Sequence, residues 1–263
     1  MRTVVISGAS SGIGQATAAR FHRAGDRVYN LDRQPPTAGS AEGVPWREVD
    51  VADWGAVEAA VAEIHAERGR LDVVIANAGI SIRHGVLELT EAEARRVCDV
   101  NLLGTLALWR CAARYMVRQD SGVLLATASV NGNRGYPWYA DYNATKAGVL
   151  ALCRTFALEL SPRIRTACVS PGGVLTPMQL AEYTEEMIAA VNARIPAGRH
   201  AAPAEIANAF YYLASPEASF LTGQELVIDG GETAGATTSD YGVALPPSRE
   251  PVAVGRPGNE RGH

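Results

Sequence analysis

The sequence contains one lysine, Lys146, among 24 lysine and arginine residues. The only lysine of so arginine-rich a chain indicates a need for an ammonium group, because a guanidinium differs in shape, hydration and acidity. Tyr142 precedes it by four residues, so the two side chains share a face on a helix. A cation about 4 Å away is expected to lower the tyrosine pKa from about 10 by roughly three pKa units. The pair predicts a tyrosine that exchanges protons near neutral pH, with a surface tyrosine–lysine stack as the alternative.

A glycine-rich turn with the sequence SGASSGIG occupies residues 7–14. It separates an expected strand, Val4–Ser7, from an expected helix, Ile13–Ala24. Glycine permits the sharp turn and lets a pyrophosphate approach the backbone at the positive end of the helix dipole. A dinucleotide-binding turn is the interpretation, and a tight turn without a ligand is the alternative. The residues of the turn expected to bind the cofactor are Gly8, Ser10, Ser11, Gly12, Ile13 and Gly14.

Two charged residues at the end of the next expected strand, Arg27–Asp32, bear on the choice of cofactor. Asp32 lies 24 residues after Gly8, where a carboxylate is placed to bond the ribose hydroxyls of the adenosine and to repel a 2′-phosphate. Arg33 follows directly and can instead meet a 2′-phosphate. Because the glycine-rich turn carries serines rather than a basic residue, NAD is favoured over NADP. An ordinary strand-end carboxylate is the alternative for Asp32.

Short apolar runs alternate with longer amphipathic stretches, and this pattern predicts the elements that position these residues. The expected strands are Val4–Ser7, Arg27–Asp32, Trp46–Val49, Leu71–Ala76, Gly122–Ala128, Ile164–Ser170 and Glu225–Ile228. The expected helices are Ile13–Ala24, Asp53–Arg68, Thr90–Arg118, Ala140–Leu160 and Ala204–Ala214. Such alternation predicts an α/β fold, a doubly wound parallel sheet of the Rossmann type with helices on both faces. One catalytic domain is expected over residues 1–231, followed by a Gly/Pro-rich tail over 232–263.

Composition excludes several other classes of function. The net charge is −4 and no basic run occurs, so a nucleic-acid surface is not expected. No stretch approaches the roughly 18 apolar residues of a membrane span, and no secretory signal is recognisable, so a cytoplasmic protein is expected. The histidines have no metal-ligand spacing, so no metal site is expected. The four cysteines are expected to be buried, reduced thiols: Cys98, Cys111, Cys153 and Cys168.

Over about residues 3–231, the chain resembles the short-chain dehydrogenase/reductase family. The resemblance rests on the glycine-rich turn, Asp50-Val51, Asn77-Ala78-Gly79, Asn101, Ser129, the pentapeptide from Tyr142 to Lys146, and Pro171-Gly-Gly-Val-Leu-Thr176. Each motif alone is modest, but their occurrence together and in order is highly specific. The first position of the turn is usually threonine in the family, and Ser7 keeps its hydroxyl.

The resemblance implies roles for these residues. Tyr142 is expected to be the general acid/base, and Lys146 to lower its pKa and bind the nicotinamide ribose. Ser129 is expected to hold the substrate oxygen and Asn101 to organise a water relay, although either residue taken alone is equally consistent with a helix cap. The remaining residues expected to contact the cofactor are Asp50, Val51, Asn77, Ala78, Gly79, Pro171, Gly172, Val174 and Thr176.

The implied reaction is hydride transfer between NAD and a secondary alcohol or its ketone. An amphipathic segment from Met178 to Ile195 matches the region that covers the substrate in the family and favours an apolar or cyclic small molecule. The residues expected to line the substrate pocket are Ser129, Asn131, Tyr136, Trp138, Tyr139, Gly173 and Met178. Ordinary core or interface packing is the alternative for these side chains.

The sequence leaves two alternative functions open and also indicates an oligomeric state. An NADPH-dependent ketone reductase of the 3-oxoacyl carrier protein type is the alternative that Arg33 supports. A non-catalytic nicotinamide-binding protein is a more distant alternative, because the full acid/base set is present. The long helical segments Thr90–Arg118 and Ala140–Leu160 resemble those that form family oligomers, so a homotetramer is expected, with a dimer second.

Overall fold

The structure is a computed structural model that describes residues 1–37 and 42–235. A compact unit spans Met1–Glu232, and a second unit begins at Thr233. Most of the predicted tail, from residue 236 onward, lies outside the described residues. The domain division at residue 231 therefore stays a prediction.

The predicted sheet is confirmed as seven parallel strands in the order β3-β2-β1-β4-β5-β6-β7. The strands are β1 Thr3–Ser7, β2 Arg27–Asp32, β3 Trp46–Glu48, β4 Val73–Ala76, β5 Gly122–Thr127, β6 Ile164–Pro171 and β7 Gln224–Ile228. All residues of β1 and β4 are buried, as expected for strands covered by helices on both faces. The chain order reverses at β1, which pairs with both β2 and β4, and ligands bind doubly wound sheets at this switch point.

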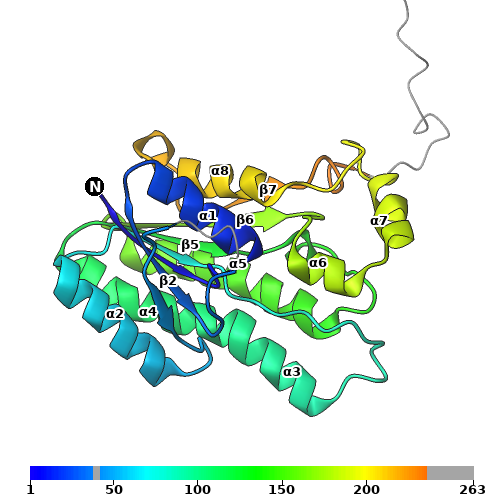
Figure 1. Ribbon diagram of the computed structural model, residues 1–263, viewed down its shortest axis with the longest axis horizontal. Helices are drawn as coiled ribbons and strands as arrows, with labels where there is room; N and C mark the ends of the chain where they lie inside the picture. Colours follow the sequence, from blue (N-terminus) through cyan, green and yellow to red (C-terminus); the bar gives the residue numbers. More distant parts are fainter. Residues whose placement is uncertain (38–41, 236–263) are drawn as a thin grey trace, which may run out of the picture. The chain divides into compact units, whose positions relative to one another are not determined.

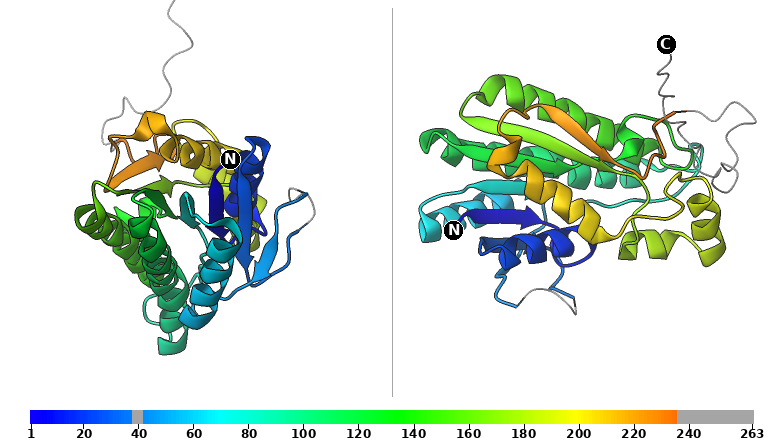
Figure 2. Two further views of the ribbon diagram at one scale, coloured as in Figure 1. Left: turned by 90° about the vertical axis from the view of Figure 1, so that its left-hand side faces the viewer. Right: turned by 90° about the horizontal axis from the view of Figure 1, so that it is seen from above.

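Helices cover both faces of the sheet, as Figures 1 and 2 show. The helices α1 Gly12–Arg23 and α8 Pro203–Leu213 lie on one face, where Phe21 and Phe210 enter an apolar core. The other face is covered by α2 Trp54–Arg68, α4 Gly104–Arg118 and α5 Ala140–Leu160, and Trp109 is its largest buried side chain. The two cores hold the strand ends, and therefore the residues just beyond them, in fixed positions.

The helical segment predicted over Thr90–Arg118 is divided in three. It comprises α3 Glu91–Cys98, a π-helical turn over Asp99–Leu103, and α4. Thr90 caps α3 through a capping box with Glu93. A π-turn inserts one residue into a helix and is common at functional sites, and here it contains Asn101.

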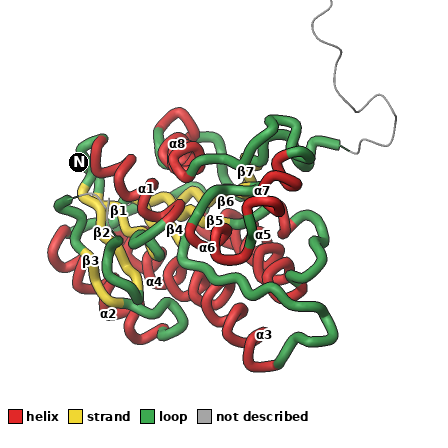
Figure 3. The backbone as a smooth tube through the Cα atoms, turned by 45° about the vertical axis from the view of Figure 1, so that its right-hand side comes forward, coloured by secondary structure: helices red, strands yellow, loops and turns green. Residues whose placement is uncertain are grey.

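The single helix expected between Met178 and Ile195 is also divided. Figure 3 shows two short helices, α6 Pro177–Glu182 and α7 Glu185–Asn192, joined by a loop. The break has a local cause, because Tyr183 is extended and the Thr184 side chain accepts from the Met187 amide to start a new helix. This segment from Met178 to Ile195, which we call the lid, is therefore a bent pair of short helices with few internal backbone hydrogen bonds.

Candidate active site

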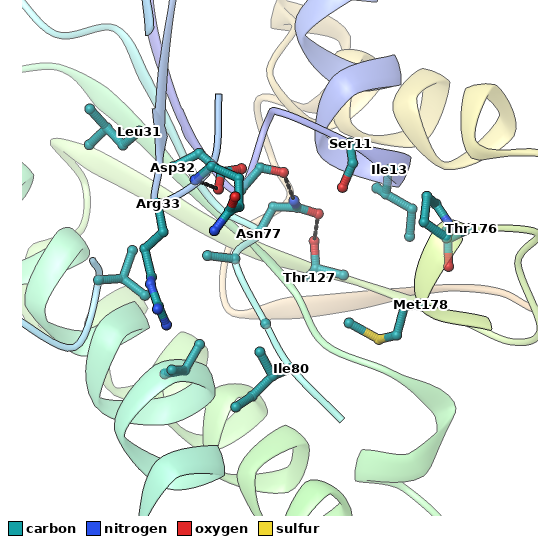
Figure 4. A pocket seen from close by; sticks show the side chains of 18 of the residues that line it. Ser11, Ile13, Leu31, Asp32, Arg33, Asn77, Ile80, Thr127, Thr176 and Met178 are labelled. Atoms are coloured by element: carbon teal, nitrogen blue, oxygen red, sulfur yellow. Dashed lines mark hydrogen bonds between the residues drawn. The ribbon is translucent and has the colours of Figure 1, made fainter. Parts of the chain in front are cut away.

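A cavity of about 400 Å³ lies where β1, β2 and β4 end, at the switch point of the sheet. Figure 4 shows part of its lining. Of the residues expected to bind the cofactor, those that line it are Gly8, Ser11, Gly12, Ile13, Asp32, Arg33, Asp50, Val51, Asn77, Ala78, Gly79, Tyr142, Lys146 and Thr176. Five other expected residues, Ser10, Gly14, Pro171, Gly172 and Val174, are outside that lining. We call this cavity the dinucleotide cleft.

The glycine-rich turn is built so that its backbone forms one wall of the cleft. Gly8 and Gly12 have φ values of 69° and 55°, which a side chain disfavours. A Cβ on Gly14 would overlap the Gly8 carbonyl and the Asn77 amide, so Gly14 permits the helix to pack against the strand ends. The Ser10 hydroxyl donates to the Gln34 carbonyl at 2.6 Å, so Ser10 stabilises the turn and is 2% exposed. The result is a narrow cradle at the N-terminus of α1 that suits a pyrophosphate.

Two charged residues, Asp32 at the end of β2 and Arg33 directly after it, line the end of the cleft that is expected to hold the adenosine. The Asp32 carboxylate accepts from the Ser10 and Gln34 amides, each at 3.0 Å, and still lines the cleft. Arg33 Nε lies 3.4 Å from Asp50 Oδ2. The arginine expected to favour a 2′-phosphate is thus already paired with a carboxylate, whereas Asp32 has no cationic partner among the residues that the structure describes.

A continuous chain of hydrogen bonds joins the glycine-rich turn to the lysine. Asn77 Nδ2 donates to the Gly8 carbonyl at 3.0 Å, and Thr127 Oγ1 donates to Asn77 Oδ1 at 2.9 Å (Figure 4). Lys146 Nζ then donates to the Thr127 carbonyl at 2.7 Å. Thr127 was not singled out from the sequence, yet it holds both Asn77 and Lys146. Its position at the end of an apolar strand was the available signal.

Tyr142 and Lys146 lie on one face of α5, as their spacing predicts, but the effect on the tyrosine pKa is opposite to that expected. Lys146 Nζ lies 5.4 Å from the Tyr142 ring centroid. Burial raises the pKa of Tyr142 to about 12, and the hydrogen bond with Ser129 opposes this. Burial also lowers the pKa of Lys146 to about 8. The sequence-based arithmetic was wrong for the protein without a ligand because it counted the cation and omitted desolvation.

Ser129 and Asn101 are both buried beside this pair. Ser129 Oγ donates to Asn131 Oδ1 at 3.2 Å and is near enough to Tyr142 to act on its pKa. The Asn101 amide holds the Ile80 backbone, accepting from its N–H at 2.8 Å and donating to its carbonyl at 2.9 Å, and its Nδ2 also donates to Thr145 Oγ1 at 3.3 Å. The π-turn thus fixes the strand-end loop that follows Gly79. The water relay expected at Asn101 stays a prediction.

A second cavity, of about 470 Å³, adjoins the first. It lies under α6 and α7, and we call it the substrate pocket. All the residues expected to line such a pocket do so, namely Ser129, Asn131, Tyr136, Trp138, Tyr139, Gly173 and Met178. Tyr142 and Met178 line both cavities. The acid/base candidate therefore stands where the two spaces meet.

The substrate pocket is more polar than the lid sequence indicated. Beside the expected apolar residues Met187 and Val191, it contains five charged or titratable side chains that sequence analysis did not select. These are Arg83, Glu182, Arg194, His200 and Glu232. No motif marks them, because they come from loops and short helices whose relative positions depend on the folded lid.

Other site chemistries lack support in the described part of the chain. Within residues 1–37 and 42–235, no group of three or more histidine, cysteine or acidic residues could hold a metal ion. No helix in these ranges is long and apolar enough to cross a membrane. The four cysteines are free thiols, and three of them are buried, namely Cys111, Cys153 and Cys168.

Comparison with known proteins agrees with this geometry. Residues 8–233 match the family model described as Enoyl-(Acyl carrier protein) reductase. The chain is 36% identical over 241 residues to 3-oxoacyl-[acyl-carrier-protein] reductase FabG of Thermotoga maritima, covering 88% of this chain and 97% of that protein. It is 37% identical over 242 residues to cis-4-hydroxycyclohexanecarboxylate dehydrogenase of Sinomonas cyclohexanicum, covering 89% and 97%.

The fold is likewise similar to that of solved dehydrogenases. The ligand-free aldohexose dehydrogenase of Thermoplasma acidophilum superposes with a TM-score of 0.85 at 32% identity, over 90% of this chain and 96% of the other. The seven-stranded parallel sheet agrees with the predicted fold class, and Ser129, Tyr142 and Lys146 line the two adjoining cavities. The chain belongs to the short-chain dehydrogenase/reductase family and is an oxidoreductase that interconverts secondary alcohols and ketones.

Proposed function

We propose that the protein is an NAD-dependent dehydrogenase of a cyclic secondary alcohol. The observation that carries this proposal is that Tyr142 and Met178 line both the dinucleotide cleft and the substrate pocket. A hydride can pass between two ligands only where they touch, and the tyrosine that exchanges the proton stands at that boundary. The similarity to cis-4-hydroxycyclohexanecarboxylate dehydrogenase supports a ring alcohol.

The residues present fit a nicotinamide dinucleotide. The cradle that Gly8 and Gly12 line at the N-terminus of α1 suits a pyrophosphate, and the Asp32 carboxylate suits ribose hydroxyls. Lys146 is 4% exposed and gives one N–H to Thr127, so its other donors are available to a second ribose. Bound there, the dinucleotide supplies the acceptor or donor of the hydride.

The protein's own residues then handle the proton and the charge on the substrate oxygen. In oxidation, Tyr142 Oη takes the proton from the alcohol; in reduction, it returns the proton to the ketone oxygen. Ser129, which lines the substrate pocket together with Tyr142, holds the same substrate oxygen through its Oγ. Because burial raises the pKa of Tyr142 to about 12, its protonated form dominates at neutral pH, which suits reduction. Oxidation needs the phenolate, so its rate is expected to rise with pH.

Cofactor choice separates this proposal from its main alternative, an NADPH-dependent 3-oxoacyl carrier protein reductase. The similarity to the Thermotoga maritima reductase and the presence of Arg33 favour that alternative. The ion pair of Arg33 with Asp50 at 3.4 Å and the carboxylate of Asp32 in the cleft favour NAD. A non-catalytic nicotinamide-binding protein is disfavoured because Ser129, Tyr142 and Lys146 are brought together.

We also propose a cytoplasmic homotetramer, with a dimer as the second possibility. Leu158 on α5 and Leu103, just before α4, are 86% and 38% exposed, and apolar side chains on long helices are suited to covering by another copy. Light scattering at micromolar concentration is expected to give a mass near four chains. A monomer would contradict the assembly.

The experiment that tests the function has two parts. Fluorescence titration with NADH and with NADPH is expected to give tighter binding of NADH. The absorbance of reduced nicotinamide then reports oxidation of a panel of ring and acyclic secondary alcohols, including hydroxyacyl thioesters. Tighter NADPH binding together with activity on acyclic thioesters alone would favour the ketone reductase.

A further inference from the structure

Two tyrosine–glutamate pairs line the substrate pocket and take no part in the chemistry described above. Tyr139 Oη donates to Glu182 Oε2 at 2.8 Å, which joins the loop before α5 to α6. Tyr136 Oη donates to Glu232 Oε1 at 2.9 Å, which joins the same loop to the segment after β7. The four side chains are partly buried. Each pair therefore presents a carboxylate to the pocket, and the two carboxylates come from different segments of the polypeptide.

The hydrogen in each pair is committed to the glutamate. Burial and the neighbouring carboxylate raise the pKa of both Tyr136 and Tyr139, so both stay protonated. A phenol has one hydrogen to donate. Tyr136 gives it to Glu232, and Tyr139, whose Oη also lies 3.2 Å from Tyr183 Oη, gives it to the closer Glu182 carboxylate. A carboxylate has about four acceptor sites, so Glu182 and Glu232 each keep acceptor capacity for a donor on a ligand.

A third acceptor lines the same pocket as Glu182 and Glu232. His200 is 3% exposed, and its Nδ1 lies 2.6 Å from Asn192 Oδ1, an acceptor, so Nδ1 carries the proton. Burial lowers the pKa of His200, which keeps the ring neutral. Its Nε2 is buried without a hydrogen-bond partner in the described structure, although a buried acceptor normally has one. This side of the pocket therefore contains hydrogen-bond acceptors that lack a donor, and a ligand with hydrogen-bond donors would satisfy them.

One of the pairs is close to the reacting centre. The Tyr139 and Tyr142 rings are in edge contact, with centroids 6.1 Å apart. Glu182 is near enough for its charge to contribute to the raised pKa of Tyr142. A hydroxyl that bonds Glu182 would thus belong to a carbon close to the reacting carbinol.

The cationic groups of the pocket are placed differently. Arg83 and Arg194 are exposed, and neither forms an ion pair within the ranges that the structure describes. The Arg83 guanidinium lies 5.4 Å from the Tyr183 ring centroid. The outer pocket therefore has donors, whereas the partly buried interior has acceptors. An anionic ring substrate held by these arginines is the competing interpretation.

We propose that the substrate is a ring alcohol with additional hydroxyl groups, and that Glu182 and Glu232 select it by accepting hydrogen bonds from those hydroxyls. This inference rests on the proposed function, because it names the substrate class of the same pocket. Uncharged rings with one hydroxyl would leave His200 Nε2 and the remaining acceptor sites of both carboxylates without donors in a ligand-filled pocket, and unpaired acceptors removed from water reduce affinity. Polyhydroxylated rings satisfy them.

The test compares NAD reduction with three ring substrates: cyclohexanol, a polyhydroxylated ring such as an inositol or aldohexose, and a hydroxycyclohexanecarboxylate. The expected kcat/KM is at least about tenfold higher for the polyhydroxylated ring than for cyclohexanol, as follows from one hydrogen bond to a charged group. In E182Q and in E232Q this ratio is expected to fall about tenfold. E185Q, an exposed position on α7 outside the pocket lining, is the matched control and is expected to keep the ratio.

Thermal unfolding of each variant verifies that it folds, and the substrate ratio is independent of the amount of active protein. A wild type that oxidises cyclohexanol as well as the polyhydroxylated ring overturns the inference and leaves the proposed function standing. So does a preference for the carboxylated ring that R83Q or R194Q abolishes. If no secondary alcohol of any kind reacts, the proposed function itself is overturned.

Discussion

The two cavities that meet at Tyr142 are built in different ways. The dinucleotide cleft is formed by backbone at the ends of parallel strands, by glycines that permit close approach, and by partly buried side chains held by backbone groups, such as Asn77. The substrate pocket is formed by side chains from loops and from the short helices α6 and α7, in which no residue is fully buried. The dinucleotide cleft, where the reaction common to the family takes place, is thus formed by closely packed backbone. The substrate pocket, which determines specificity, is formed largely by side chains that are only partly buried.

The largest effect is expected where the cleft buries a charge. Lys146 has a folded-state pKa of about 8, below an unfolded value near 10.4, so between these values the unfolded chain holds more protons and stability rises with pH. Lys146→Met removes this dependence. Its stability relative to wild type is expected to fall by roughly 2–3 kcal/mol between pH 7 and pH 10, measured by urea denaturation.

The matched control for this charge lies in the other cavity. Arg194 is exposed in the substrate pocket, and Arg194→Met is expected to change stability equally at both pH values. Other titrating groups cancel, because each variant is compared with wild type at the same pH. A difference between Lys146→Met and wild type that does not change with pH would contradict a buried ammonium.

The next effect concerns backbone packing in the cleft. A Cβ at Gly14 would overlap the Gly8 carbonyl, so Gly14→Ala is expected to weaken NADH binding by about 5- to 150-fold, the range for overpacking by about 1–3 kcal/mol. A Cβ at Gly135, in the loop before Tyr136, meets no atom within 4 Å. Gly135→Ala is expected to bind NADH within about twofold of wild type. Equal losses in both variants would remove the contrast between the cavities.

Most of the residues that form the dinucleotide cleft could be predicted from the sequence, because strand ends and helix spacing fix where they lie. Asp32 ends one apolar strand and Asn77 directly follows another, and parallel strand ends must meet at one edge of the sheet. Tyr142 and Lys146 are fixed by helix geometry alone. Glu182, His200 and Glu232 come from separate segments, whose meeting depends on how the lid folds. The division of the lid at Tyr183 and the π-turn at Asn101 also depend on tertiary contacts.

Two residues show what local patterns leave undecided. The charge of Lys146 was predictable, but the pKa of Tyr142 depends on how completely the fold removes water from it, and burial is the largest influence on that pKa. Ser10 has the position of a cofactor ligand in the turn, yet its hydroxyl bonds the Gln34 carbonyl. Both outcomes are set by packing that only the folded chain specifies.

A smaller effect is expected at the selector of the cofactor. Asp32→Asn removes the charge facing a 2′-phosphate while keeping an acceptor for the Ser10 or Gln34 amide. The ratio of the NADPH and NADH dissociation constants is expected to shift about tenfold toward NADPH, measured by fluorescence titration. Arg33→Gln is expected to shift the ratio in the opposite direction or leave it unchanged, and a shift of Arg33→Gln toward NADPH would contradict the assignment.

The smallest effect is expected in the lid. Met187 lies on α7, lines only the substrate pocket and is partly buried. Met187→Ala is expected to raise the KM of the ring substrate by about 2- to 10-fold, because it removes part of an apolar contact. The NADH dissociation constant is expected to stay within about twofold. A comparable loss of NADH binding would mean that the two cavities are not separable.

The most direct test of the meeting point is Tyr142→Phe, assayed both for NADH binding and for turnover of the ring alcohol. Tyr142 lines both cavities, and the substitution removes one hydroxyl from the boundary between them. We expect NADH to bind within about twofold of wild type while kcat falls by about 10²- to 10⁴-fold, the usual contribution of a positioned acid/base. Turnover near that of wild type would show that the proton is exchanged elsewhere and would contradict the account.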